Sequence, residues 1–176
     1  IFINYFIYLF IMDLKNSLQI YELASEVIDK CRSKKLKISV AESCTGGLIS
    51  SIITSIPGSS DIFECGFITY SNDSKRKFLN VSQNTLNLYG AVSEEVVIEM
   101  INGLKYNTKS EILLAISGIA GPGGGSKEKP EGLVWISYVF KNNNIKTGKH
   151  KFGPIGRELV REKSSIVSLK YLLSML

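Results

Sequence analysis

The chain has only 3 cysteines and 1 histidine, and these shortages argue against two kinds of site. Cys31, Cys44 and Cys65 form no CxxC pair and have no spacing typical of a metal site. Since an odd number of cysteines cannot pair completely, we expect free thiols in a reducing cytoplasm. His150 lies in a polar stretch, where we expect a surface histidine rather than the base of a Ser-His-Asp triad.

The chain also lacks an apolar run long enough to cross a membrane. Residues 1–11 are almost wholly apolar, but a helix needs about 20 residues to cross a bilayer. They have neither the basic n-region nor the small-residue cleavage site of a signal peptide. We therefore expect Met12 to be the natural start and residues 1–11 to be an upstream extension. The alternative is that these residues anchor the chain on a membrane surface.

Charge is not concentrated anywhere along the chain. The 21 Lys and Arg residues exceed the 16 acidic ones by 5, but they are scattered. The densest basic run, residues 32–37, is typical of a solvated loop rather than of a nucleic-acid footprint. A modest positive balance suits a small anionic substrate. A length of 176 residues predicts one domain with a core of its own.

Hydrophobic periodicity predicts an α/β protein. Strands are expected at 37–41, 63–70, 111–117, 132–140 and 145–152, and helices at 14–31, 48–56, 75–88 (one or two), 93–104 and 156–176. The segment 111–117 is continuously apolar from Ile112 to Ile116, as in a strand buried on both faces. Early strands separated by helices indicate parallel β-α-β units with right-handed crossovers.

The segment Val-Ala-Glu-Ser-Cys-Thr-Gly-Gly at 40–47 joins a strand to a helix. Gly46 and Gly47 would let the backbone come close to a ligand, and Ser43 would meet free N–H groups at the helix N-terminus. That setting suits an anion or a developing oxyanion. The alternative is a Ser/Thr cap with glycines for tight packing. Cys44 is the more reactive group, but as the neighbour of a cleft-facing Ser43 it should point elsewhere and serve packing.

Two more polar residues lie at predicted carboxyl ends of strands. Tyr70 and Ser117 end the second and third strands, so they should share one rim with Ser43. Lys75 follows Tyr70 by five residues. Because no histidine is available as base, a Ser-Lys arrangement aided by the tyrosine is the plausible way to activate Ser43. Lys75 would need a lowered pKa; its alternative role is that of a solvated helix lysine.

Residues 118–125 form the most glycine-dense loop. This loop is neither a G-x-G-x-x-G fingerprint nor a complete P-loop. Its exposed N–H groups could line an anion or oxyanion site, or the loop could be a long turn between strands.

Arg157 and Arg161 lie four residues apart at the start of the last helix. Cations at that position repel each other and oppose the helix dipole. The pair is either an ordinary charged face with Glu158 and Glu162, or at least one arginine holds a phosphate.

Five short segments occur together in this chain. They are Ala-Glu-Ser-Cys-Thr-Gly-Gly at 41–47, Tyr-Ser-Asn at 70–72 with Lys75, Gly-Ala-Val-Ser at 90–93, Gly-Ile-Ala-Gly-Pro at 118–122 and Lys-Pro-x-Gly at 129–132. In this order they closely resemble the CinA C-terminal family, over roughly residues 36–176. The resemblance implies a three-layer α/β/α sandwich with a mostly parallel mixed sheet. It also implies deamidation of nicotinamide mononucleotide to nicotinic acid mononucleotide and ammonia.

The resemblance assigns roles by motif. It implies Ser43 as nucleophile with Tyr70 and Lys75 as activating partners, and it leaves open which of these two is the general base. The implied substrate-binding residues are Thr45, Gly46, Asn72, Ser117, Gly118, Gly121, Gly123 and Arg157. Ser117 stands where the family usually has threonine, which preserves a hydroxyl.

The resemblance further implies a stand-alone amidase domain, which we expect at 12–176 because Met12 is the expected start. It would have no metal or other cofactor, a pyridine-nucleotide substrate, no nucleic-acid or membrane partner, and a second copy in a homodimer. Two other hypotheses stay open. One is a different Ser-Lys amide hydrolase, although the S-x-x-K spacing of the penicillin-recognising kind is missing. The other is a non-catalytic nucleotide-binding or interaction module, because a fold does not fix a function.

Overall fold

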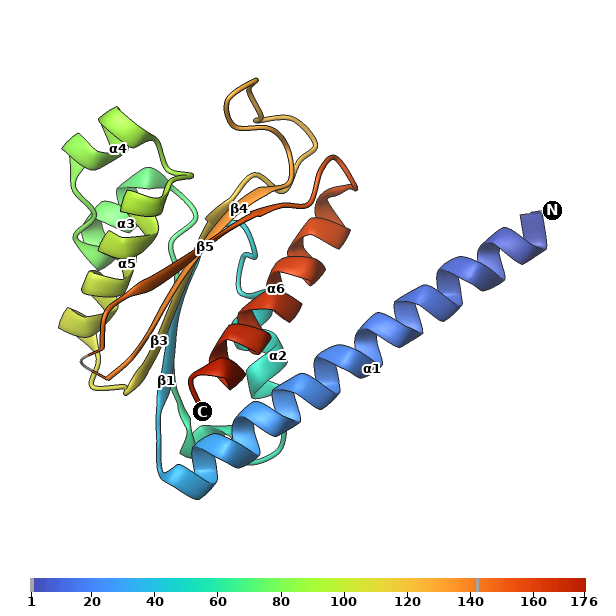
Figure 1. Ribbon diagram of the computed structural model, residues 1–176, viewed down its shortest axis with the longest axis horizontal. Helices are drawn as coiled ribbons and strands as arrows, with labels where there is room; N and C mark the ends of the chain where they lie inside the picture. Colours follow the sequence, from blue (N-terminus) through green and yellow to red (C-terminus); the bar gives the residue numbers. More distant parts are fainter. Residues whose placement is uncertain (1, 142) are drawn as a thin grey trace.

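The computed structural model describes the backbone of residues 2–141 and 143–176, and side chains from residue 16 onward within these ranges. A central sheet separates two layers of helices, as Figure 1 shows. The five strands are β1 (Ile38–Glu42), β2 (Phe63–Ile68), β3 (Ile112–Gly118), β4 (Leu133–Phe140) and β5 (Lys146–Lys151). Their order in the sheet is β2-β1-β3-β4-β5.

Helices α1 (Phe2–Lys34), α2 (Leu48–Thr54) and α6 (Arg157–Ser174) pack together on one face of the sheet. Helices α3 (Asn72–Leu79), α4 (Gln83–Tyr89) and α5 (Glu94–Asn107) cover the other face, where α5 contacts the sheet (Figure 1). The only other helical piece in the described ranges is a 3-10 turn, η1 (Ser59–Asp61). The predicted three-layer α/β/α architecture is therefore confirmed.

Alternation along the strands divides the core between the two layers. Val40 and Leu114 face the α1, α2 and α6 side, whereas Ala41 and Ala115 face the α5 side. Successive strand side chains point to opposite faces, and all of these positions are buried. This explains why β3 is apolar at almost every position.

Strand β1 pairs in parallel with β2 on one side and with β3 on the other. Strand β4 runs antiparallel to both β3 and β5, so the sheet is mixed, as predicted. The chain leaves β1 through α2 on one face and reaches β3 through α3, α4 and α5 on the other. The carboxyl ends of β1 and β3 therefore form the point where strand order reverses, which is where ligands bind in open α/β sheets.

Two helices differ from the sequence predictions. Helix α1 runs without a break from Phe2 to Lys34 and crosses the predicted boundary at Met12, because the segment has no proline or glycine to stop it. The side chains of residues 1–15 lie outside the described residues. The predictions for the apolar segment 1–11, an upstream extension or a membrane-surface anchor, therefore stay predictions. No helix in the described ranges is both long and apolar enough to cross a membrane. Between 75 and 88 there are two helices, and the first begins earlier than predicted, at Asn72.

Candidate active site

Ser43 lies one residue beyond β1, at the junction with β3. Its N–H donates to the Ile116 carbonyl at 3.1 Å, and its carbonyl accepts the Gly46 N–H at 3.0 Å. Gly46 and Gly47 adopt positive φ angles of 60° and 92°, which other residues rarely take. These two glycines delay the start of α2 to Leu48, so Ser43 belongs to a turn in front of the helix.

The N-terminus of α2 is not a free anion site, which corrects the sequence-based expectation. The fully buried Glu42 carboxylate accepts the N–H groups of Gly47, Ile49 and Ser50 at 2.8–3.1 Å. Its Oε1 also accepts the Ser50 hydroxyl at 2.7 Å. A carboxylate at this end of a helix satisfies the donors and complements the dipole. A substrate oxyanion must therefore use other donors.

Lys75 is buried although it belongs to a polar helix. Ser71 caps α3 through a capping box with Ser74, which fixes the helix register and points Lys75 inward. Only 1% of Lys75 is exposed, and its Nζ lies 2.9 Å from Ser43 Oγ and 2.8 Å from the Thr69 carbonyl oxygen. Burial lowers the pKa of the Lys75 ammonium to about 8. The solvated helix lysine considered above is therefore wrong for this residue.

Tyr70 lies at the same rim, but its hydroxyl has a different partner. Tyr70 Oη accepts a hydrogen bond from Arg157 Nη2 at 2.7 Å, and the ring is 59% exposed. Arg157 Nη1 also donates to the Gly121 carbonyl at 3.2 Å. One guanidinium thus joins the end of β2, the glycine loop and the first turn of α6.

Ser117 and Gly118 form the β3 side of the rim. The Ser117 hydroxyl donates to the Ala91 carbonyl at 2.7 Å and so holds the segment before α5 against the strand end. A Cβ at Gly118 would lie 2.7 Å from Val134 Cγ2 and 3.0 Å from Cys44 Sγ. The close approach of β4 and of the Ser43 turn therefore requires glycine at 118.

These side chains enclose one cavity of about 170 Å³. It is lined by Ser43, Cys44, Tyr70, Lys75, Ala91, Val92, Ser117, Gly118, Ala120 and Arg157. Six residues predicted from the sequence are among them: Ser43, Tyr70, Lys75, Ser117, Gly118 and Arg157. Thr45, Gly46, Asn72, Gly121 and Gly123 are not part of this lining. The cavity combines a hydroxyl, a buried amine and a guanidinium within one small space.

The carboxylate of Glu131, which does not line the cavity, holds the glycine loop. The Gly123 N–H donates to the Glu131 carboxylate at 2.6 Å, and a Cβ at Gly121 would lie 2.6 Å from the same carboxylate. Gly121 contributes its carbonyl to Arg157, and Gly123 is exposed. Sequence reasoning did not single out Glu131, which stands ten residues after Gly121 in an ordinary polar stretch.

Cys44 shares the cavity with Ser43 but is a poor nucleophile. Burial raises the pKa of its thiol to about 12, and the nearby Glu42 carboxylate acts in the same direction. A thiol needs its thiolate form to react, so this environment disfavours Cys44. The packing role expected for Cys44 agrees with its 5% exposure, but the expectation that it points away from the cleft is wrong, because Cys44 lines the cavity beside Ser43.

His150 is half-buried on β5 rather than a plain surface residue. Its Nε2 lies 2.9 Å from the Tyr171 hydroxyl, and its ring stacks on Phe152. Burial lowers its pKa. It does not line the cavity at Ser43. Within the described part of the chain, no three His, Cys, Asp or Glu residues are placed to hold a metal ion.

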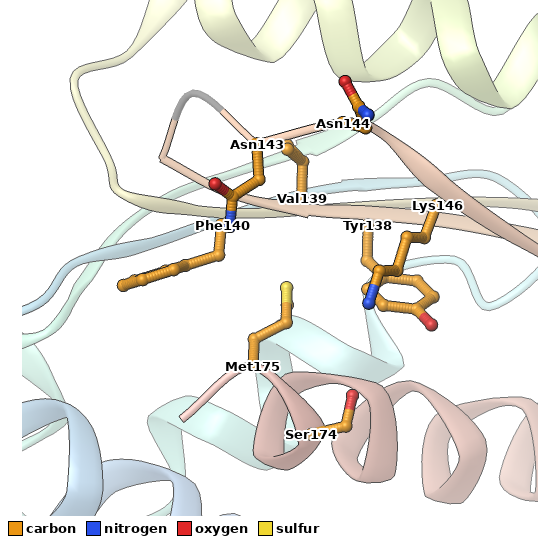
Figure 2. A pocket seen from close by; sticks show the side chains of 8 residues that line it. All are labelled: Tyr138, Val139, Phe140, Asn143, Asn144, Lys146, Ser174 and Met175. Atoms are coloured by element: carbon orange, nitrogen blue, oxygen red, sulfur yellow. The ribbon is translucent and has the colours of Figure 1, made fainter.

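A second hollow, also of about 170 Å³, lies between the β4–β5 turn and the end of α6 (Figure 2). Its lining residues are Tyr138, Val139, Phe140, Asn143, Asn144, Lys146, Ser174 and Met175. In Figure 2 the Met175 side chain points between Phe140 and Tyr138, and Lys146 lies beside the Tyr138 ring. Nothing pairs a nucleophile with a base among these side chains, so the Ser43 cavity is the better candidate.

Arg161 is a further residue whose role sequence reasoning missed. It does not line the cavity; its Nε and Nη2 donate to the Thr45 carbonyl at 3.0 and 2.8 Å. Thr45 itself is fully buried. The spacing of Arg157 and Arg161 placed both on one helix face. It did not predict that Arg157 would bind Tyr70 and the glycine loop while Arg161 binds the Ser43 turn.

The chain is similar to known proteins in sequence and in structure. The model of the CinA C-terminal domain family matches residues 20–176. The nicotinamide-nucleotide amidohydrolase PncC of Enterobacter agglomerans is 45% identical over 86% of this chain and 92% of its own length. A CinA-like protein of Thermosipho melanesiensis is 46% identical, but the match spans only 39% of that longer protein.

Solved structures show the same fold. The competence/damage inducible protein CihA of Agrobacterium tumefaciens superposes with a TM-score of 0.87 at 41% identity, covering 89% of this chain and 95% of that one. The competence damage-inducible protein A of Klebsiella pneumoniae gives 0.84 at 32% identity, with 88% and 95% covered. The chain therefore belongs to the CinA C-terminal domain family.

Proposed function

We propose that this chain is an amidohydrolase that converts nicotinamide mononucleotide to nicotinic acid mononucleotide and ammonia. The observation that carries the proposal is the 2.9 Å contact between Lys75 Nζ and Ser43 Oγ inside a cavity that also holds Arg157. The name of the PncC relative supports the substrate class.

In this proposal Ser43 is the nucleophile and Lys75 is the general base. A pKa of about 8 leaves a useful fraction of Lys75 neutral near pH 7. The neutral amine keeps a hydrogen bond to the Thr69 carbonyl and directs its lone pair at the Ser43 hydroxyl. Ser43 Oγ attacks the carboxamide carbon as its proton passes to Lys75.

The remaining steps return that proton. Lys75 gives it to the amide nitrogen, the C–N bond breaks and ammonia leaves, so that an acyl ester remains on Ser43. Water, deprotonated by Lys75, then attacks the ester; the bond to Ser43 Oγ breaks as Lys75 returns the proton to that oxygen, and the product acid is released. Tyr70 is not required as a base in this scheme, because Lys75 already lies within hydrogen-bond distance of the Ser43 hydroxyl.

We assign the tetrahedral oxyanion to backbone donors of the Ser43 turn. Glu42 occupies the donors of α2, and Glu131 occupies the Gly123 N–H. Among the described residues, no backbone carbonyl accepts a hydrogen bond from the N–H of Cys44 or Thr45, although both N–H groups also act on the Cys44 sulfur and oppose the rise of its pKa. A donor directly after the nucleophile is well placed for an oxyanion.

Arg157 is the proposed contact for the substrate phosphate. Its guanidinium lines the cavity and is held by Tyr70 and Gly121 at the rim. A planar guanidinium suits bidentate contact with phosphate. Thr45, Gly46, Asn72, Gly121 and Gly123 stay predicted binding residues, and they lie outside the lining of this cavity.

Three wider expectations belong to the same proposal. The functional unit would be residues 12–176, it would act in the cytoplasm, and it would form a homodimer. Measuring the mass of the chain in solution tests the homodimer directly.

The decisive experiment follows ammonia release and nicotinic acid mononucleotide formation from nicotinamide mononucleotide. S43A should abolish turnover while it still binds the mononucleotide. C65A replaces a cysteine on β2, outside the cavity, and should retain turnover. Tight mononucleotide binding without product would instead favour a binding module. Activity that survives S43A but is lost in C44A would make the thiol the nucleophile.

A further inference from the structure

Arg161 reaches across from α6 to the backbone of the Ser43 turn. Its Nε and Nη2 both donate to the single carbonyl oxygen of Thr45, at 3.0 and 2.8 Å, although 116 residues separate the two positions. The Arg161 side chain does not line the cavity that holds Ser43 and Lys75. A fork-shaped guanidinium that closes on one buried carbonyl restrains both its position and its orientation.

The restraint passes to Ser43 through two peptide units, Thr45–Gly46 and Ser43–Cys44, which a hydrogen bond joins. A peptide bond is planar and trans, so the C=O and N–H of one unit point in opposite directions. With the Thr45 carbonyl held by Arg161, the Gly46 N–H points the other way, and it donates to the Ser43 carbonyl at 3.0 Å. By the same rule, the Cys44 N–H points away from that hydrogen bond.

Other ties in this turn are few. The Ser43 N–H is held by Ile116 and the Gly47 N–H by the Glu42 carboxylate, and the Leu48 N–H reaches the Thr45 carbonyl at a longer 3.3 Å. The hydroxyl of Thr45 is buried and has no hydrogen-bond partner among the described residues, so the threonine side chain does not fix its own backbone. Gly46 adds freedom, because it has no Cβ.

We infer that Arg161 is a positioning residue that sets the orientation of the Ser43 turn. Through the Thr45–Gly46 and Ser43–Cys44 peptides it holds the nucleophile and the Cys44 N–H in register with Lys75. This inference rests on the proposed function, because it takes Ser43 as the nucleophile. Since a displacement of about 1 Å costs up to about a hundred-fold in rate, loss of the fork should lower kcat.

The test compares R161K and R161A with K163M. R161K keeps the charge and the aliphatic stem but not the fork. K163M removes a positive charge from an exposed position two residues further along α6. We expect kcat with nicotinamide mononucleotide to fall about ten-fold or more in both Arg161 variants with KM within about two-fold, and to be unchanged in K163M. Millimolar guanidinium should restore part of the activity of R161A.

A second measurement does not depend on the substrate. A fluorophosphonate probe phosphonylates a reactive serine as the serine oxygen displaces fluoride, and intact-mass spectrometry gives the rate. We expect Ser43 in the R161K chain to label about ten-fold more slowly than in the unmodified chain at equal thermal stability.

Several outcomes would overturn the inference. These are unchanged Ser43 labelling in R161K, a rise in KM without a fall in kcat, or unfolding of both Arg161 variants, since unfolding would make the residue structural. If the unmodified chain labels at Ser43 in an Arg161-dependent manner but releases no ammonia, the proposed function fails and the positioning role stands.

Discussion

The hydroxyl of Tyr70 accepts a hydrogen bond from Arg157 at 2.7 Å. This contact joins the connection after β2 to the first turn of α6, on the open side of the cavity. The tyrosine oxygen is therefore hydrogen-bonded to a guanidinium. Lys75 is then the group within hydrogen-bond distance of the Ser43 hydroxyl. The two activating partners suggested by the sequence therefore have different neighbours, and their variants should behave differently.

We expect Y70F to weaken substrate binding more than chemistry. Loss of the acceptor frees Arg157, so KM should rise about five-fold with kcat within about three-fold, in line with an exposed hydrogen bond to a charged group. Steady-state kinetics of ammonia release measure both constants. A fall in kcat of a hundred-fold or more would instead identify Tyr70 as the general base.

The rate of amide hydrolysis should depend on the protonation of Lys75. Burial lowers the pKa of its ammonium to about 8, and only the neutral amine can take the Ser43 proton. We expect kcat/KM to rise about ten-fold per pH unit below this value and to level off above it. K75R keeps the charge but cannot lose a proton, so it should be inactive across the profile. A profile without an inflection near pH 8 would contradict the assignment of Lys75 as base.

The buried lysine should also make stability depend on pH. Its pKa is about 8 in the folded chain and 10.5 by reference, so between these values the unfolded chain binds one proton more. Stability should therefore rise with pH across this window, by roughly 3 kcal/mol in total, and be lost again as pH falls toward 8.

The measurement is urea unfolding of the unmodified chain and of K75M at several pH values across this window. In K75M the dependence due to this group should disappear. K77M removes an exposed lysine from the same helix and should leave the dependence in place. Equal slopes in the unmodified chain and in K75M would show that Lys75 is not the group responsible.

Replacing the Glu42 carboxylate should destabilise the chain. In E42Q an amide NH2 would face backbone N–H groups at the N-terminus of α2, leaving buried donors without acceptors. We expect a loss of roughly 2–4 kcal/mol in the free energy of unfolding, measured with urea. E22Q, at an exposed position on α1, should change stability by less than about 0.5 kcal/mol. A small effect in E42Q would mean that the cap contributes little.

The sequence by itself determined the sheet and the rim. Apolar runs such as 111–117 predicted the strands because burial on both faces requires apolar side chains at nearly every position. The β-α-β pattern then predicted that Ser43 and Ser117 would meet at strand ends, and both line the cavity. Lys75 and Arg157 were candidates from their residue types and spacing, the motif resemblance assigned them roles, and both line the cavity too. Local patterns were sufficient here because strand ends and crossovers follow from chain geometry.

Only the tertiary structure decided which partner each polar group has. Glu42, Glu131 and Arg161 resemble ordinary polar residues in the sequence, yet they fasten the α2 N-terminus, the glycine loop and the Ser43 turn. Likewise, Lys75 has the sequence surroundings of a solvated lysine but is 1% exposed. Hydrogen bonds and desolvation depend on contacts between remote segments, and no local pattern of residue types records those contacts.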